Sequence, residues 1–150
     1  MKALIVYYSR TGNTEKIAKE ISGNLKVDID EIIDMTNRKG IIGWLRGGRD
    51  AMKNILTEIK NKKNPLRYDL VIIGTPIWAG TLCPAVRTYL SKNKFKKIAF
   101  FCTFGGNPGK SFEEMEKLSK KPVAKLGIKD TDIKKGTYKG LLNDFLKKIR

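Results

Sequence analysis

The sequence predicts an α/β protein in which helices surround a doubly wound, five-stranded parallel sheet. Short apolar runs alternate along the chain with segments of helical periodicity, as in proteins built from strand–helix–strand units. The run Leu70–Thr75 is almost wholly apolar, which is typical of a central parallel strand covered on both faces. The length of 150 residues suits one compact domain, so we expect residues 1–150 to form a single domain.

The elements expected from these patterns alternate in type along the chain. The apolar runs predict strands at Lys2–Tyr8, Val27–Ile33, Leu70–Thr75, Lys97–Thr103 and Val123–Ile128. The periodic segments predict helices at Thr14–Leu25, Pro84–Lys92, Lys110–Ser119 and Tyr138–Ile149.

A basic stretch, Ile41–Lys60, lies between the second and third expected strands. Its apolar residues recur at helical spacing, so we expect a further helix there, although the pair Gly47-Gly48 weakens its first part. The side chains expected to face the core from this helix are Leu45, Met52, Ile55, Leu56 and Ile59.

The chain is strongly basic, with 31 Lys and Arg against 15 Asp and Glu and a net charge of +16. Such an excess suggests an acidic partner, a nucleic acid or a membrane surface, although runs of charge are usually solvated faces. Two segments stand apart, because residues 68–86 carry only one charge, Asp69, and residues 98–109 carry none. The positive charge therefore lies in the expected helices and connections, away from these two segments.

Composition excludes several kinds of chemistry. The chain has no histidine, which rules out Ser-His-Asp and Cys-His catalysis, and its two cysteines, Cys83 and Cys102, form no CxxC pattern. We therefore expect no disulfide framework, no metal site and no catalytic side chain. No apolar run approaches the ~18 residues that cross a bilayer, and the N-terminal run is too short for a secretory signal. We expect a cytoplasmic protein.

Ligands of doubly wound sheets bind beyond the carboxyl ends of the strands, which directs attention to the loops after strands one, three and four. The first loop reads Ser9-Arg10-Thr11-Gly12-Asn13-Thr14. Hydroxyl and amide side chains, backbone N–H groups and a helix N-terminus can together surround an anion, and a glycine permits the tight turn. A simple helix cap would need only one of these side chains, so the loop predicts a phosphate site.

This loop resembles the phosphate-binding loop of the flavodoxin family, which holds the phosphate of FMN. The resemblance covers nearly the whole chain and implies a flavodoxin-like fold with strand order 2-1-3-4-5. It implies FMN as the cofactor, with Ser9, Thr11, Gly12, Asn13 and Thr14 at the phosphate and Arg10 at the variable position. The basic surface departs from the pattern, since well-known flavodoxins are acidic.

The resemblance also implies that the second and third loops flank the flavin ring. In the second loop the implied cofactor-binding residues are Thr75, Pro76, Ile77, Trp78, Ala79 and Gly80. Trp78 would cover one face of the ring, with core packing as the alternative, and the Ala79-Gly80 peptide would be the one that can flip toward reduced flavin N5. In the third loop they are Thr103, Phe104, Gly105, Gly106 and Asn107. The tyrosine that often stacks on the ring is absent there, and the residue covering the outer face is left open.

Other nucleotide sites fit the sequence less well. Gly109-Lys110-Ser111 resembles the end of a P-loop, but the full pattern needs a glycine where Phe104 stands, and Pro108 lacks the backbone donor that a phosphate cradle uses. A nucleic-acid-binding module is suggested only by the pI of about 9.9, without aromatic residues interleaved in a basic stripe.

The sequence therefore predicts an FMN-binding electron-transfer protein in which the flavin performs the redox chemistry. The alternative on the same scaffold is an FMN-dependent NAD(P)H or quinone reductase, which would need room for a second substrate. We expect redox partner proteins, with acidic surfaces as a possibility suggested by the charge. We expect neither a nucleic-acid partner nor a membrane span.

Overall fold

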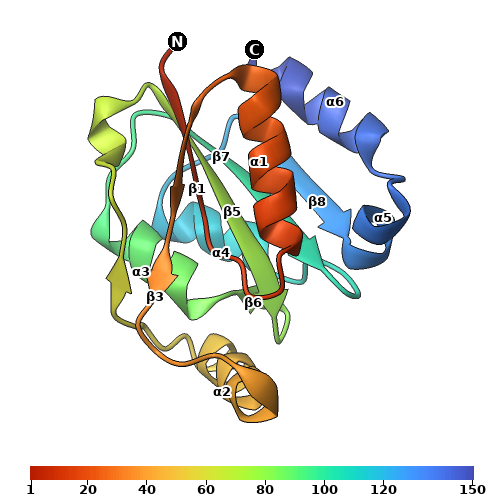
Figure 1. The fold of residues 1–150 in the computed structure, drawn as a ribbon. Coiled ribbons are helices and arrows are strands. Elements are labelled where there is room, and N and C mark those ends of the chain that lie inside the picture. Colours follow the sequence, from red (N-terminus) through yellow and green to blue (C-terminus); the bar gives the residue numbers. More distant parts are fainter.

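The computed structural model describes residues 1–150 and shows a parallel sheet between two layers of helices (Figure 1). The central strands occur in the order β2-β1-β5-β7-β8, which confirms the flavodoxin-like order 2-1-3-4-5. The parallel strands are β1 (Ala3–Tyr7), β2 (Asp28–Glu31), β5 (Leu70–Trp78), β7 (Ile98–Phe104) and β8 (Lys125–Lys129). The helices around them are α1 (Asn13–Leu25), α3 (Pro84–Lys92), α4 (Ser111–Leu118), α5 (Asp130–Lys135) and α6 (Lys139–Ile149).

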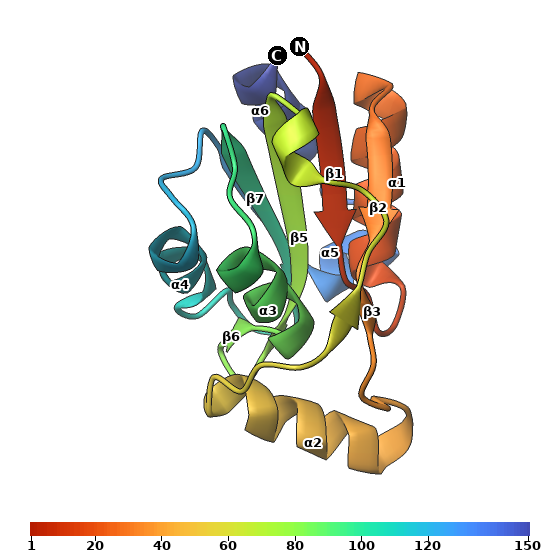
Figure 2. The same cartoon turned by 90° about the vertical axis from the view of Figure 1, so that its left-hand side faces the viewer.

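Alternation of side chains along the strands divides the core into two parts. In β1, Ala3, Ile5 and Tyr7 face a cluster that includes residues of α1, α5 and α6. Leu4 and Val6 face the opposite cluster, which is built with residues of α3 and α4. Figure 2 views the sheet from the side and shows these two helical layers. Because both faces are covered, the central strands can be apolar throughout.

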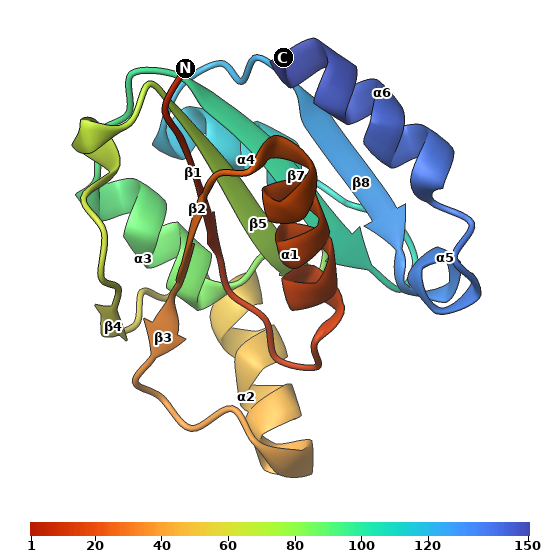
Figure 3. The ribbon, with the colours of Figure 1, turned by 45° about the horizontal axis from the view of Figure 1, so that its top comes forward.

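The parallel register brings the carboxyl ends of the central strands to the same edge. Ile5 of β1 lies opposite Ile72 of β5, and Ile73 of β5 lies opposite Phe100 of β7. Close packing at this centre involves Gly74, because a Cβ there would lie 2.1 Å from the ring of Phe101. The loops that follow β1, β5 and β7 therefore emerge side by side, as Figure 3 shows.

Several short elements were not expected from the sequence. The predicted second strand, Val27–Ile33, divides into β2 and β3 (Ile33–Asp34), and β3 pairs antiparallel with β4 (Ile59–Lys60) outside the main sheet. A 3-10 turn, η1 (Pro65–Arg67), precedes β5, and β6 (Thr81–Leu82) forms a hairpin with the end of β5.

The prediction of one helix over Ile41–Lys60 is wrong in length and in orientation. The helix α2 spans Gly40–Met52, and Asn54 after it adopts a left-handed conformation with φ of 55°. Asn is one of the few residues other than glycine that tolerate this conformation, which commonly ends helices.

The expected buried side of that helix is also wrong. Leu45, Met52, Ile55 and Leu56 are exposed, and only Ile59, which lies in β4, packs partly against the core. The buried residues of α2 are Gly43, Gly47, Asp50 and Ala51. Leu141 of α6 is exposed as well. None of the helices combines the length and the apolar character that a transmembrane segment requires.

Two glycine substitutions test the packing at the centre of the sheet. Gly74→Ala should lower the free energy of unfolding by about 1–3 kcal/mol, because its methyl group would collide with the buried Phe101 ring. Gly23→Ala in α1 is the matched control, because a Cβ there meets no atom within 4 Å. That control should raise stability by about 0.5–1 kcal/mol through helix propensity. Urea unfolding curves measure both, and equal effects at the two positions would contradict the packing described here.

Candidate ligand-binding site

The first loop of the candidate site connects β1 to α1. Gly12 stands at the N-cap of α1 with φ of 100°, a conformation that favours glycine, and its amide donates a hydrogen bond to Ser9 Oγ at 3.1 Å. No side chain caps the helix, so the amides of its first turn are free to bind an anion. Ser9, Gly12 and Asn13 are half-buried and Thr11 is exposed, which leaves the loop open on its outer side.

Thr14 has a structural contact that the sequence did not reveal. It is buried, and its hydroxyl shares a hydrogen bond of 2.8 Å with the hydroxyl of Thr103 at the end of β7. This bond joins the first loop to the third across the strand that separates them. Asp130, at the start of α5, also faces this loop, and burial raises the pKa of its carboxyl although a hydrogen bond from Asn13 opposes the rise.

The second loop is a tight hairpin between β5 and β6. Ala79 and Gly80 form its turn, with φ of 50° and 77°. Trp78 before the turn and Thr81 after it lie opposite each other in the antiparallel pair of β5 and β6. Positive φ at both central residues is the geometry of a two-residue type I′ turn. Ala79 is a non-glycine residue in a conformation that favours glycine, so the turn carries backbone strain. The structure thus places the predicted Ala79-Gly80 peptide at an exposed, strained turn.

The beginning of the second loop is fully enclosed. Thr75 is 0% exposed, and its hydroxyl donates to the carbonyl of Pro76 and accepts a bond from the amide of Cys83. Its side chain thus supports the hairpin from within. Pro76 and Ile77 are half-buried and lead the strand outward to the turn.

The third loop contacts the second through its backbone. The carbonyl of Gly80 accepts a hydrogen bond from the amide of Lys110 at 3.0 Å. A Cβ at Gly109 would lie 2.1 Å from that same carbonyl oxygen, so only glycine fits at this approach. The hydroxyl of Ser111 donates to the carbonyl of Pro108. The segment that resembled the end of a P-loop therefore makes internal contacts.

The aromatic residues of the second and third loops differ in their surroundings. Phe104 is 8% exposed, and its ring lies 3.1 Å from where a Cβ on Gly127 would stand, so it packs toward β8. Gly105, Gly106 and Asn107, which follow it, are exposed. Trp78 is half-buried and its ring meets the ring of Tyr8 edge-on, with 5.6 Å between centroids. Trp78 thus remains the aromatic side chain placed to contact a ligand.

Helix α2 lies beyond the carboxyl ends of the strands and borders the site there. A Cβ on Gly47 would be 2.9 Å from the ring of Trp78, so the glycine lets the helix approach the indole closely. A cavity of about 510 Å³ lies between α2 and the second loop. Its lining includes Gly43, Gly47, Met52, Ile77, Trp78 and Ala79.

A buried ion-pair cluster, formed by Asp34, Arg38 and Asp50, joins the segment before α2 to the last turn of the helix. Arg38 is 5% exposed and donates from Nε to Asp34 Oδ2 at 3.0 Å and from an Nη atom to Asp50 Oδ2 at 2.6 Å. The guanidinium carbon also lies 5.9 Å from the centre of the Trp78 ring. The one sequence signal for this cluster was a single acidic residue, Asp50, within an otherwise basic segment.

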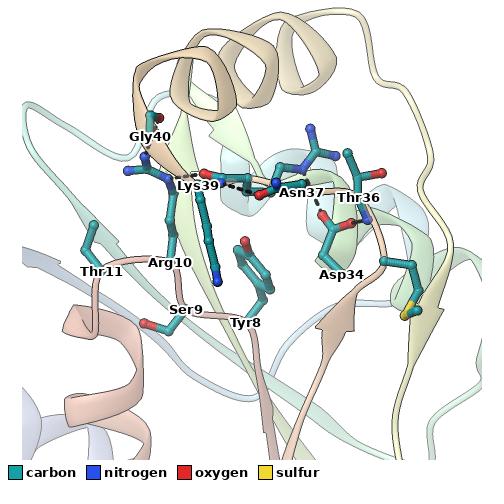
Figure 4. A pocket seen from close by; sticks show the side chains of 11 residues that line it. Tyr8, Ser9, Arg10, Thr11, Asp34, Thr36, Asn37, Lys39 and Gly40 are labelled. Atoms are coloured by element: carbon teal, nitrogen blue, oxygen red, sulfur yellow. Dashed lines mark hydrogen bonds and ion pairs between the residues drawn. The ribbon is translucent and has the colours of Figure 1, made fainter.

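Arg10 connects this cluster to the first loop, as Figure 4 shows. Its side chain donates to the carbonyl of Arg38 at 2.8 Å and to the carbonyl of Gly40 at 3.0 Å. Arg38 lies just before the start of α2 and Gly40 begins it, so Arg10 fixes the helix relative to the first loop. Arg10, which the resemblance placed at the variable position of the first loop, therefore links that loop to the start of α2. Its neighbourhood includes a second hollow, of about 620 Å³, bordered by Tyr8 and residues 34–40.

Both cysteine thiols are buried away from solvent. Burial raises the pKa of Cys83 to about 11 and that of Cys102 to about 12, so both thiols stay protonated and unreactive at neutral pH. No three His, Cys, Asp or Glu side chains are grouped to hold a metal ion.

Comparison with known proteins identifies the family. The sequence matches the flavodoxin domain over residues 4–140. The chain belongs to the flavodoxin family. A search of the curated proteins finds no match.

Solved structures of flavoproteins share the fold of this family member. A flavoprotein from Lactobacillus acidophilus NCFM, solved in complex with FMN, has 23% identity and a TM-score of 0.68, with 91% of this chain and 98% of that chain covered. A putative flavoprotein from Bacteroides uniformis has 20% identity and a TM-score of 0.71, over 91% and 97% of the two chains. Oxidised flavodoxin 1 from Bacillus cereus has 18% identity and a TM-score of 0.55, over 99% and 97%.

The ion-pair cluster predicts a pH-dependent attachment of α2. Burial by itself raises the pKa of Asp50, but hydrogen bonds from Arg38 and Arg49 outweigh it and hold the pKa below its usual range. The stabilisation from ionised Asp50 is therefore complete above the unfolded pKa of about 3.9 and is lost as the pH falls through the lower folded value. Near-ultraviolet circular dichroism, to which Trp78 contributes, and the thermal unfolding temperature should be followed from pH 7 to pH 2. Both should show this loss only below about pH 4.

Asp50→Asn should weaken this attachment at neutral pH by about 2 kcal/mol, because a charged hydrogen bond to a buried guanidinium is lost. Asp144→Asn on α6 is the control, since Asp144 is exposed and should have little effect. The same acid transition in wild type and Asp50→Asn would show that other carboxylates determine it.

Proposed function

We propose that this chain binds FMN at the edge formed by the loops after β1, β5 and β7 and carries electrons. The observation that carries the proposal is the junction of these loops. The Thr14–Thr103 hydrogen bond and the Gly80–Lys110 contact join them around an uncapped helix N-terminus. Membership of the flavodoxin family supports the same cofactor, as does FMN in the Lactobacillus acidophilus flavoprotein.

The residues present fit FMN in three respects. The open conformation at Gly12 leaves room beside free helix amides for a phosphate. The exposed turn Ala79-Gly80 and the exposed backbone of Gly105 and Gly106 offer polar groups to the edges of a ring. Trp78 offers an aromatic face at the same edge. When bound, FMN would supply the redox chemistry, and the protein would supply position and electrostatics.

Each segment of the site has a distinct part in this proposal. The amides after Gly12, with the Ser9, Thr11 and Asn13 side chains, would hold the phosphate. Thr14 would act from beneath the loop, because its hydroxyl is already bonded to Thr103. Thr75 would support the ring-flanking turn from within the protein, and Phe104 would support the third loop in the same way.

An electron carrier needs a partner, and the charge supports an acidic redox protein. The net charge of +16 would speed encounter with such a protein in a salt-sensitive manner. No residue of the site has to transfer a proton for outer-sphere electron transfer. We expect the protein to act in the cytoplasm.

One observation favours the second candidate, an FMN-dependent NAD(P)H or quinone reductase. The cavity of about 510 Å³ beside Trp78 is lined largely by apolar residues and glycines and could admit a second, flat substrate. An assay of steady-state NADH or NADPH oxidation with a quinone acceptor distinguishes the electron carrier from the reductase. A carrier should show only slow turnover unless a separate reductase is added, whereas an enzyme turns over alone.

Flavin titration of two variants tests the location of the site. Gly12→Val should abolish most FMN binding, because a β-branched residue is strained at φ of 100° and would crowd the anion. Lys110→Ala should leave binding nearly unchanged, although it would be damaging in a P-loop. Isothermal calorimetry on the apoprotein measures both, with FAD as the comparison ligand. Tighter binding of FAD than of FMN, or loss of binding only in Lys110→Ala, would contradict the phosphate-loop assignment.

The basic surface should raise the reduction potential of bound FMN relative to acidic members of the family. Reduced flavin gains negative charge, which positive surroundings favour. Exposed charges are screened beyond about 8–10 Å, so the potential should fall by about 10–30 mV between low and high salt. Potentiometric titration at two ionic strengths measures this change. A low potential that does not respond to salt would show that contacts at the ring determine it.

A further inference from the structure

The outer side of α2 is the largest unexplained apolar feature of the molecule. Seven of the thirteen exposed large hydrophobic side chains lie between residues 41 and 56. Ile41 and Ile42 are 79% and 82% exposed, and Trp44 is 63% exposed. Leu45 and Met52 extend the same exposed surface to the rim of the cavity beside Trp78, which they line together with Trp44. We call these five residues, Ile41, Ile42, Trp44, Leu45 and Met52, the α2 apolar surface.

This surface cannot be buried by a simple rotation of the helix. The opposite side of α2 is made of small residues that already contact the rest of the protein closely. A Cβ on Gly43 would lie 2.2 Å from the backbone of Arg38, and one on Gly47 would lie 2.9 Å from the Trp78 ring. Asp50 on this inner side is paired with Arg38. Glycine contacts and an ion pair therefore hold the apolar surface outward.

The charges around the α2 apolar surface are all of one sign. Residues 35–57 include five basic side chains, and their only acidic one, Asp50, is buried and bonded to Arg38 at 2.6 Å. The basic residues left at the surface are Lys39, Arg46, Arg49 and Lys53. Long basic side chains can bury their stems beside apolar groups and extend their charges to a polar layer.

We propose that the α2 apolar surface docks on the interface of a lipid bilayer that contains anionic lipids. Large apolar side chains including a tryptophan, together with flanking Lys and Arg, are the features of a helix that lies in the plane of the interface. Anionic headgroups, which enrich the cytoplasmic leaflet, complement the basic flanks and the net charge of +16. This proposal goes beyond the proposed function and does not depend on FMN.

The chemistry of α2 favours a bilayer over another protein. The sequence Gly40–Met52 contains no Ser, Thr, Asn or Gln, so the indole N–H of Trp44 is the one neutral side-chain donor on its outer side for the hydrogen bonds that set the register of a protein interface. The positive charge is also spread over the whole chain, with a net +5 in residues 87–97 and +6 in residues 110–150. A second copy would bring the same basic flanks against each other. A fluid anionic bilayer, in contrast, imposes no fixed alignment of side chains, so docking on it does not need such directional hydrogen bonds.

The position of α2 suits such docking. Figure 2 shows the helix lying across one end of the molecule, with its axis transverse to the strands and no other element beyond it. Its whole length can therefore lie against a flat surface. Docking in this orientation would bring the carboxyl edge of the sheet, with the turn at Ala79-Gly80, toward the bilayer.

Sedimentation of the full-length protein with vesicles tests the proposal. The protein should bind vesicles of phosphatidylcholine mixed with phosphatidylglycerol at least about tenfold more tightly than vesicles of phosphatidylcholine alone. The double variant Ile41→Ser/Ile42→Ser should reduce binding to the mixed vesicles about tenfold, because two apolar side chains no longer enter the interface. Leu141→Ser on α6, where Leu141 is 52% exposed, is the matched control and should change binding less than about twofold.

Charge variants separate the helix from the general basic surface. Arg46→Gln/Lys53→Gln should weaken binding to the mixed vesicles more than Lys147→Gln/Lys148→Gln, although each pair removes two positive charges. Brominated lipids should quench the fluorescence of a Trp78→Phe variant, in which Trp44 is the one tryptophan left, more than that of Trp44→Phe.

Three results would overturn the proposal. Absence of binding to the mixed vesicles would leave an acidic protein as the partner of this surface. Binding that survives Ile41→Ser/Ile42→Ser unchanged would show attraction by charge alone. A dimer in light scattering that the same double variant dissociates, without vesicle binding, would assign the surface to a second copy. Circular dichroism of each variant verifies that it is folded, and FMN titration shows separately whether the flavin site is intact.

Discussion

Parallel pairing of β1, β5 and β7 places every candidate ligand-binding loop at one edge of the sheet. Parallel strands must be joined by crossovers, so their carboxyl ends and the loops after them collect on the same side. Register then decides which residues meet. In this chain it brings Thr14 to Thr103 and Gly80 to the amide of Lys110, two contacts that join three segments distant in sequence. The geometry of the candidate site is therefore a consequence of the packed core beneath it.

Helix α2 depends on a second interaction, the ion pairs of Arg38 with Asp34 and Asp50. Removing charged groups from water costs free energy, and the short, charge-assisted hydrogen bonds between these groups offset part of that desolvation cost. The glycines of the helix let it approach Trp78, and Arg10 connects its start to the first loop. The same arrangement that closes one side of the site also holds large apolar residues in solvent.

The distribution of charge gives the site and the surface different properties. Residues 68–86 and 98–109 are nearly free of charge, so local dipoles and stacking would dominate close to a flavin bound there. The basic residues lie on the helices and connections, where their long-range field acts on partners or surfaces. The proposals for an acidic redox protein and for an anionic bilayer use the same excess of positive charge, and the bilayer proposal also gives a role to the exposed apolar side of α2.

Sequence alone determined the α/β class and the five main strands, because these depend on local patterns of apolar residues. From turn chemistry it also predicted a phosphate site in the loop after β1. It also singled out the loops at 75–80 and 103–107, since neutral, glycine-containing segments are unusual in a chain this basic. The tertiary structure decided how their side chains are used. Thr75 is buried beneath the hairpin and bonds to the amide of Cys83, and Phe104 packs toward Gly127 on β8. Arg10 connects to α2 because its acceptors are carbonyls 28 and 30 positions away.

Helix α2 shows most clearly what local pattern could not decide. Its apolar spacing predicted that Leu45 and Met52 would be buried, yet they are exposed. The reason is steric and electrostatic: only glycine can approach Trp78 and the Arg38 backbone so closely, and Asp50 must face Arg38. These partners are set by the fold and not by the helix. Sequence by itself thus determined that the segment is helical and basic, whereas the close contacts of the folded chain decided which of its sides faces the solvent.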